Sequence, residues 1–183
     1  MAVLFSTSGA SPGSVGHRMR LALGSGHHDL ATRALVMGVA RPPDELVAQG
    51  AEILEIDGPC WPPVAAGVAV CVPASDEAAV ERAVTGGADL VRMSQPTTAS
   101  LRLCAAAGVA VLVPVATAGA AAAAGLPIER IVVESLVVDM TADACPVAAT
   151  AVGVIRGARI VRTADVQGAR RICDVLAAVL EAR

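Results

Sequence analysis

The sequence predicts an α/β fold of parallel strands, a (β/α) barrel of the TIM type that is reduced or incomplete. A recurring phrase supports this prediction: an amphipathic stretch, then Gly-Ala or Gly-Val, then a β-branched run. Glycine commonly ends a helix because the closing position takes left-handed backbone, and a short apolar run suits a strand covered on both faces. Repetition of helix, glycine and strand therefore indicates βα units. The phrase occurs at Gly50–Leu54, Gly87–Val91, Gly108–Leu112 and Gly157–Val161.

Seven strands and six helices follow from this pattern. The expected strands are Leu35–Val39, Glu52–Asp57, Val68–Val72, Asp89–Met93, Val109–Val113, Arg130–Glu134 and Ala158–Arg162. The expected helices are Pro43–Gln49, Asp76–Thr85, Thr98–Ala107, Ala118–Ala124, Cys145–Arg156 and Val166–Ala182. Ser75 is a candidate N-cap of the second helix, and residues Ile172, Val175, Leu176 and Val179 give the last helix an apolar stripe.

The length of the chain limits the barrel. A complete eight-unit barrel takes about 250 residues, whereas this chain has 183. The residues between Asp57 and Gly67 are too few for a normal crossover helix, and the stretch after Glu134 lacks room for a full helix and strand before Cys145. A reduced barrel and a doubly wound sheet both fit this shortening, and the barrel is the fold class that we expect.

The chain divides into an N-terminal extension, residues 1–32, and an α/β barrel domain, residues 33–183. The extension is expected to be partly flexible, because Ser6–Gly16 is rich in serine and glycine. Within it, Val3–Phe5 is a candidate for an additional strand, and His27-His28-Asp29 is expected in a solvated loop.

The composition excludes several classes of protein. A formal charge of −3 and 1% aromatic residues argue against a nucleic-acid partner. The uncharged stretch Leu103–Ile128 is mostly Ala and Gly and is broken by proline, so no membrane span is expected. The first residues lack the pattern of a secretion signal, which favours the cytoplasm. Five cysteines without a C-x-x-C pair indicate neither a zinc site nor a disulfide framework, and no metal or cofactor is expected.

Four charged residues fall at predicted strand ends, where parallel α/β folds place their chemistry. The carboxylates could accept hydrogen bonds from a heterocycle or act as a general base, and the arginines could hold a carboxylate or phosphate. The alternative is that all four pair with one another as structural salt bridges. No His, Lys or Cys lies at a strand end, so no catalytic residue is assigned. These four candidate binding residues are Asp57, Arg92, Glu134 and Arg162.

Several phrases resemble the dihydropteroate synthases, pterin-binding (β/α)-barrel enzymes of folate synthesis. The most specific is Arg156–Val166, which is similar to the family's last-strand phrase G-A-x-I-V-R-V-H-D-V. Four further stretches are similar to other strands of the family. The first strand is matched by Leu35–Val39, the second by Gly50–Gly58, the third to fourth by Val68–Met93 and the sixth by Glu129–Glu134. The resemblance covers about Arg33 to Arg183 and implies a barrel, a pterin-like or anionic ligand, and a homodimer.

Most functional residues that the resemblance implies are absent. Glu134 replaces the sixth-strand aspartate, and Arg162 matches the anion-binding arginine, but Ala164 replaces the neighbouring histidine. Pro73 and Arg92 stand where the family has Asp and Asn, and the Ser-Arg-Lys strand is expected to be deleted. The sequence contains no lysine and no asparagine at all.

Three hypotheses of function remain. The leading one is a degenerate, catalytically inactive dihydropteroate synthase-like protein that acts as a binding or oligomeric partner. The alternative is a dihydropteroate synthase-type transferase of folate biosynthesis, with Arg162 holding an anion and Glu134 orienting a ring. The third is a purely structural interaction module, which predicts a mouth closed by salt bridges and without a cavity.

Overall fold

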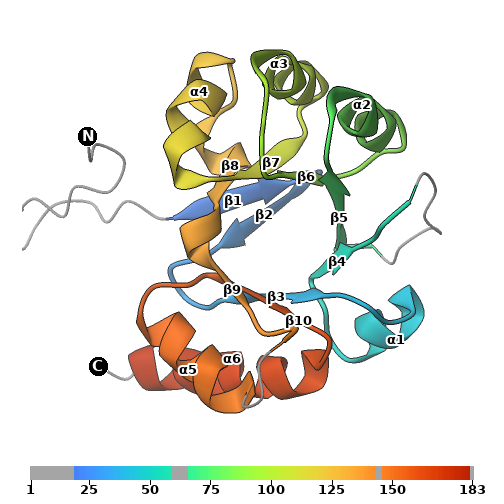
Figure 1. Cartoon of the computed structure of the whole chain (residues 1–183). Coiled ribbons are helices and arrows are strands. Elements are labelled where there is room, and N and C mark those ends of the chain that lie inside the picture. Colours follow the sequence, from blue (N-terminus) through green and yellow to red (C-terminus); the bar gives the residue numbers. More distant parts are fainter. Residues whose placement is uncertain (1–18, 59–65, 143–145, 182–183) are drawn as a thin grey trace, which may run out of the picture.

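The computed structural model describes residues 19–58, 66–142 and 146–181, and its main feature is a single parallel sheet that curls into a nearly closed barrel (Figure 1). The strands follow one another as β8-β7-β6-β5-β4-β3-β10-β9. The first strand of the domain therefore lies beside the last predicted strand, as in a barrel and not in a doubly wound sheet. The reduced TIM-type barrel is confirmed. The strands are β3 (Leu35–Gly38), β4 (Ile53–Glu55), β5 (Ala69–Ala74), β6 (Leu90–Met93), β7 (Ala110–Val113), β8 (Ile131–Val133), β9 (Val137–Asp139) and β10 (Ile160–Thr163).

Helices cover the outside of the barrel in two groups (Figure 1). Two helices begin at a side-chain cap. At α2 (Glu77–Thr85), Asp76 accepts a hydrogen bond from the Ala79 N–H, and at α3 (Thr98–Ala107), Thr97 and Ser100 form a capping box. The cap of α2 is therefore Asp76 and not Ser75. Helices α2, α3 and α4 (Ala118–Ala123) lie on one side, and α1 (Pro43–Ala48), α5 (Pro146–Ile155) and α6 (Val166–Glu181) lie on the opposite side.

An eighth strand, β9, was not predicted from the sequence. Residues Glu134–Leu136 form a single 3₁₀ turn, and the chain passes through it directly from β8 to β9 (Figure 1). These two strands are the ends of the strand order, and no ladder joins them in the described part of the chain. Two consecutive parallel strands that pair with each other need a crossover helix between them. Because β9 pairs with β10 and not with β8, no helix is needed between β8 and β9.

A β-hairpin closes the amino-terminal end of the barrel. Its strands are β1 (Arg20–Leu23) and β2 (Gly26–Asp29), so residues 27–29 lie in a strand and not in the expected solvated loop. Leu21 and Leu23 are almost fully buried in the cluster that fills the barrel interior. The turn needs a glycine at position 24, because its φ is +54° and a side chain there would collide with Asp89. The candidate strand at residues 3–5 lies outside the described residues.

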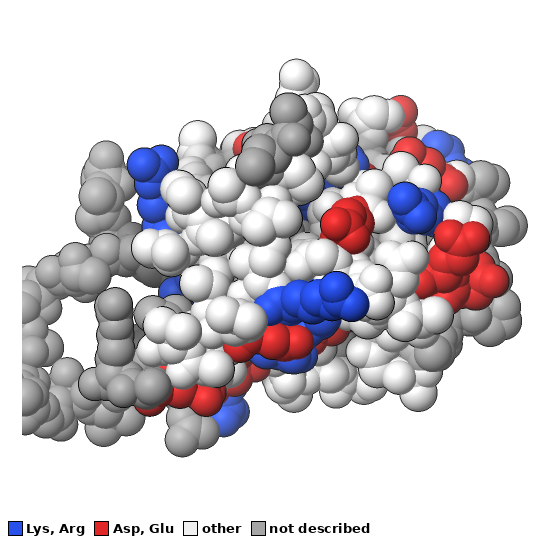
Figure 2. Space-filling view, turned by 90° about the horizontal axis from the view of Figure 1, so that it is seen from below, with Lys and Arg blue, Asp and Glu red and all other residues white. Residues whose placement is uncertain are grey.

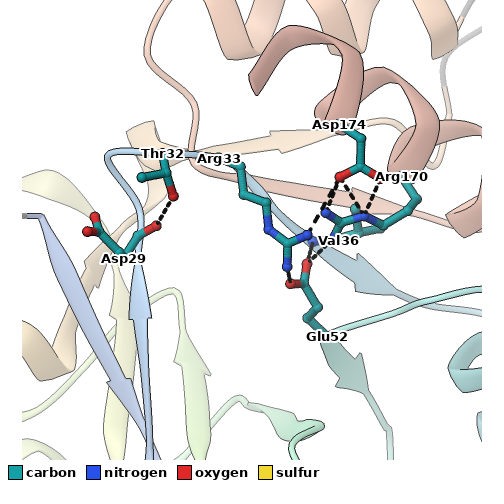
Figure 3. A network of polar contacts seen from close by, with 7 residues as sticks. All are labelled: Asp29, Thr32, Arg33, Val36, Glu52, Arg170 and Asp174. Atoms are coloured by element: carbon teal, nitrogen blue, oxygen red, sulfur yellow. Dashed lines mark hydrogen bonds and ion pairs between the residues drawn. The ribbon is translucent and has the colours of Figure 1, made fainter. Parts of the chain in front are cut away.

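Ion pairs fasten α6 to the same end of the barrel (Figure 3). Glu52, just before β4, accepts hydrogen bonds from Arg33 and from Arg170 of α6, the latter at 2.6 Å. Arg170 also binds Asp174, one helical turn further along, through its Nε at 3.1 Å. The network thus joins the segment before β3, the start of β4 and the first half of α6.

The last helix has more than one apolar face. Its core face is Val166, Ala169 and Cys173, all almost fully buried. Val175 and Val179, two residues of the predicted apolar stripe, are 62% and 49% exposed. Among the described residues, no helix combines the length and the apolar character needed to cross a membrane.

Candidate functional site at the mouth of the barrel

Three charged side chains rise from strands into the carboxyl-terminal mouth of the barrel: Glu55 of β4, Arg92 of β6 and Arg162 of β10. Each stands two residues after a side chain buried in the barrel interior, namely Ile53, Leu90 and Ile160, respectively. Alternate residues of a strand share a face. The strand pattern therefore directs all three charges into the mouth, above the apolar core.

Glu55 holds the two arginines together. Its Oε2 accepts hydrogen bonds from the Nε of Arg92 and the Nε of Arg162, both at 3.0 Å. Its Oε1 accepts from the Nη2 of Arg92 at 3.3 Å and the Nη2 of Arg162 at 2.6 Å. On the other side of Arg162, Nη1 lies 2.7 Å from the Oδ2 of Asp139, at the end of β9. One carboxylate thus receives two forked guanidinium contacts, and a second carboxylate occupies the remaining edge of Arg162.

The electrostatics favour the charged forms of Glu55 and Arg162. Burial opposes ionisation of Glu55, but the hydrogen bond from Arg162 and the charge of Arg92 outweigh it, so the pKa of Glu55 lies below its ordinary value. The hydrogen bond to Glu55 is likewise the main cause that raises the pKa of Arg162. The side chain of Glu55 is only 6% exposed, so water screens these contacts little.

Acid is therefore expected to weaken the fold through Glu55. Because its pKa is lower in the folded chain than in the unfolded chain, deprotonation favours folding. This stabilisation is complete above the ordinary glutamate pKa of 4.5 and is lost as the pH falls through the lowered folded value. Urea unfolding between pH 7 and pH 3 should show the decline, and Glu55→Gln should flatten it. Equal slopes in both proteins would contradict this assignment.

A cavity of about 520 Å³ opens beside the cluster. It lies over the ends of β3, β4 and β10, where Arg162 and Glu55 meet the segment between β3 and α1. In that segment Ala40 has a φ of 60°, a left-handed conformation that is uncommon for a residue with a side chain. The walls combine charged and apolar groups: Val39, Ala40, Arg41, Pro42, Pro43, Glu55, Ile56, Asp57, Thr141 and Arg162.

The structure brings some of the four predicted site residues together and separates one. Arg162 and Asp57 both line the cavity, and Arg92 reaches Arg162 through Glu55. Glu134 is exposed in the 3₁₀ turn after β8 and does not line this cavity. Trp61, the single tryptophan of the sequence, lies outside the described residues.

Two residues of the cluster were missed in the sequence. The predicted strand ran to Asp57, whereas β4 ends at Glu55, so the strand-end carboxylate is two residues earlier. Alternation could have found it, because Ile53 and Glu55 share one face of the strand. Asp139 carried no comparable signal, since its strand has three residues and no preceding helix.

No metal site emerges from residues 19–58, 66–142 and 146–181, where no three His, Cys, Asp or Glu side chains are grouped to hold an ion. Three cysteines, Cys71, Cys104 and Cys173, are buried. Burial raises the pKa of Cys104 and of Cys173 to about 11, so neither is a ready nucleophile.

Comparison with known proteins identifies the fold. No protein-family model and no curated protein matches the sequence. Among solved structures, dihydropteroate synthase of Yersinia pestis is 17% identical, with a TM-score of 0.70 over 90% of this chain and 99% of that chain. Dihydropteroate synthase of Burkholderia cenocepacia, complexed with 7,8-dihydropteroate, is 20% identical, with a TM-score of 0.72 over 89% of this chain and 97% of that chain. The chain has the dihydropteroate synthase fold. A third example, the Thermus thermophilus enzyme in complex with 4-aminobenzoate, is 21% identical, with a TM-score of 0.69 over 89% of this chain and 99% of that chain.

One expectation drawn from the dihydropteroate synthase resemblance is wrong. The strand with the family's Ser-Arg-Lys phrase was expected to be deleted, but β9 occupies the place beside β10 where a seventh strand belongs. Its sequence is Val137-Val138-Asp139, so the strand is present without the basic residues. In their place it brings a carboxylate to Arg162.

Proposed function

We propose that this chain is a catalytically inactive protein with the dihydropteroate synthase fold, which acts as a binding or oligomeric partner. The observation that carries the proposal is the pairing of charges at the mouth. Glu55 binds both Arg92 and Arg162, and Asp139 binds the remaining edge of Arg162. Groups that satisfy one another in the resting protein are poorly placed to stabilise charge that develops on a substrate.

The residue types at the mouth support the same proposal. The sequence has no lysine and no asparagine, and Ala164 stands where the resemblance implies a histidine. A site that loses positioned hydrogen-bonding groups loses orders of magnitude in rate. The shared fold does not by itself supply an activity.

An apolar surface on α5 and α6 supports a homodimer. Three exposed apolar side chains lie on α5, and Val175 and Val179 follow at a spacing of one turn on α6. Figure 2, viewed from the side of these helices, shows wide areas without charged side chains. Contiguous exposed apolar patches commonly mark protein interfaces. The three residues of α5 are Val147, Val152 and Ile155.

The cavity at the mouth of the barrel supports the binding of a small molecule by this protein. Its volume of about 520 Å³ lies within the range of small-molecule sites, roughly 300–1,000 Å³. Arg41 and Arg162 could hold an anionic group, and Pro42, Pro43 and Ile56 could contact a ring. Pterins and aminobenzoates are the natural first probes, because structures of this fold hold 7,8-dihydropteroate and 4-aminobenzoate.

Sedimentation velocity and a turnover assay on the full chain test the two halves of the proposal. We expect a dimer at micromolar concentration and no condensation of pterin pyrophosphate with 4-aminobenzoate. Val175→Glu should shift the protein towards monomer because it places a charge in the apolar patch. Val115→Glu is the matched control, since Val115 is 60% exposed and lies after β7, away from α5 and α6. It should leave the dimer intact.

The same experiment can contradict the proposal in two ways. Robust turnover would favour the alternative, a dihydropteroate synthase-type transferase. A monomer at every concentration, or equal effects of the two valine substitutions, would remove the oligomeric role assigned to α5 and α6.

A further inference from the structure

Arg162 has a carboxylate on each edge of its guanidinium group, and the two carboxylates differ in how firmly they are held. Nε and Nη2 donate to Glu55, and Nη1 donates to Asp139. The side chain of Glu55 is 6% exposed, whereas that of Asp139 is 53% exposed. Glu55 also binds Arg92, so moving it would break the contacts of two guanidinium groups at once.

Asp139 can be displaced much more easily than Glu55. It is the last residue of the three-residue edge strand β9. Its Oδ1 accepts hydrogen bonds from the backbone N–H and hydroxyl of Thr141, at 3.0 and 2.7 Å, and its Oδ2 contacts Arg162. An exposed ion pair stabilises a fold only slightly. The loss of this contact would therefore be a small penalty for any ligand that replaced it.

The cavity lies where such a ligand would enter. Thr141 and Arg162 both line it, and the Thr141 hydroxyl lies 3.4 Å from Nη1, the edge of Arg162 that Asp139 covers. Arg41, which is exposed, lines the same cavity and adds a second positive charge.

The charge balance shows what Asp139 does to the site. With it in place, the mouth and cavity hold three arginines, at positions 41, 92 and 162, and three carboxylates, at positions 55, 57 and 139. These charges sum to zero. Without Asp139 the sum is +1, and one guanidinium edge is open to an anion.

We propose that Asp139 is an internal occupant of an oxyanion site, and that a carboxylate or phosphate group of a small molecule binds Arg162 by displacing it. The inference rests on the ligand-binding role proposed above for the cavity and deepens it. The ligand class is a molecule with one oxyanion group, because only one edge of Arg162 is released. Asp139 thus sets the affinity of the site by competing with the ligand.

Calorimetric titration of the full chain with inorganic phosphate, and separately with 4-aminobenzoate, tests this inference. Asp139→Asn should bind the matching probe roughly 3- to 5-fold more tightly than the unaltered protein, the gain expected from removing one weak, exposed ion pair. The two probes distinguish a phosphate-bearing from a carboxylate-bearing ligand. Asp139→Ser serves as a second variant if the asparagine protein does not fold, and circular dichroism checks folding.

Asp174→Asn is the matched control. Asp174 is also 53% exposed and bound to an arginine, but it lies at the amino-terminal end of the barrel (Figure 3). Its replacement should leave the affinity unchanged, and adding Arg162→Ala to Asp139→Asn should abolish the gain. The inference is overturned if Asp139→Asn binds no more tightly than Asp174→Asn, or if no protein in the series binds either probe. Neither result bears on the dimer or on the absence of turnover, which are measured separately.

Discussion

Replacing Glu55 by glutamine is expected to lower the free energy of unfolding by roughly 3 kcal/mol, the low end of the range for breaking a buried ion pair. The amide keeps the size of the side chain but loses its charge and one acceptor oxygen. Arg92 and Arg162, now held together by one carboxylate, would then face each other with a single weak acceptor between them. Because the side chain of Arg92 is 36% exposed and Arg162 keeps Asp139, water and that carboxylate limit the loss.

Urea unfolding at pH 7, followed by far-ultraviolet circular dichroism, measures this effect. Glu81→Gln is the control, because Glu81 is an exposed glutamate on α2 that forms no salt bridge with any residue of the described part of the chain. Its effect should stay within about 0.5 kcal/mol, as for most surface substitutions. If Glu55→Gln costs no more than Glu81→Gln, the mouth network does not hold the strands together.

The sequence predicts those strands of the barrel that follow a glycine and consist of a short buried run. Glycines 50, 87, 108 and 157 all have positive φ, as expected of residues that end a helix or turn before a strand. The buried runs that follow them form β4, β6, β7 and β10. These are local properties of backbone and side chain, so they can be read without knowledge of the partner strands.

What the sequence does not predict depends on contacts between distant segments. β9 is a three-residue strand whose register is set by β10, with Val137 opposite Ile160. The pairing of Glu55 with Arg162 joins residues 107 positions apart, and no local pattern specifies it. The candidate residues Arg92 and Arg162 were found because they end strands, whereas the carboxylates that bind them were not.

The hairpin is a second case in which tertiary packing decides. The expected boundary at residue 33 placed its sequence in a partly flexible N-terminal extension, with the adjacent histidines in a loop. In the structure Leu21, Leu23 and Leu30 join the interior cluster, and the Nη2 of Arg130 contacts the Gly24 carbonyl at 3.4 Å. The apolar residues of the hairpin are buried only because the barrel leaves its amino-terminal end open to them.

Leu21→Ala is therefore expected to destabilise the protein by about 3 kcal/mol, within the range for buried leucines in well-packed cores. Leu21 is 2% exposed and packs against the interior cluster at the amino-terminal end of the barrel. Its truncation removes buried apolar surface and leaves a cavity among the side chains packed inside the barrel.

His27→Ala is the control within the same hairpin, since His27 is exposed on β2 and its removal should cost less than about 0.5 kcal/mol. Urea unfolding of the full chain compares the two. A large effect of Leu21→Ala alone would show that the folded unit begins before residue 33, because a flexible extension contributes nothing to the free energy of unfolding. Equal small effects would show the opposite, namely that the hairpin contributes little to the free energy of unfolding of the barrel.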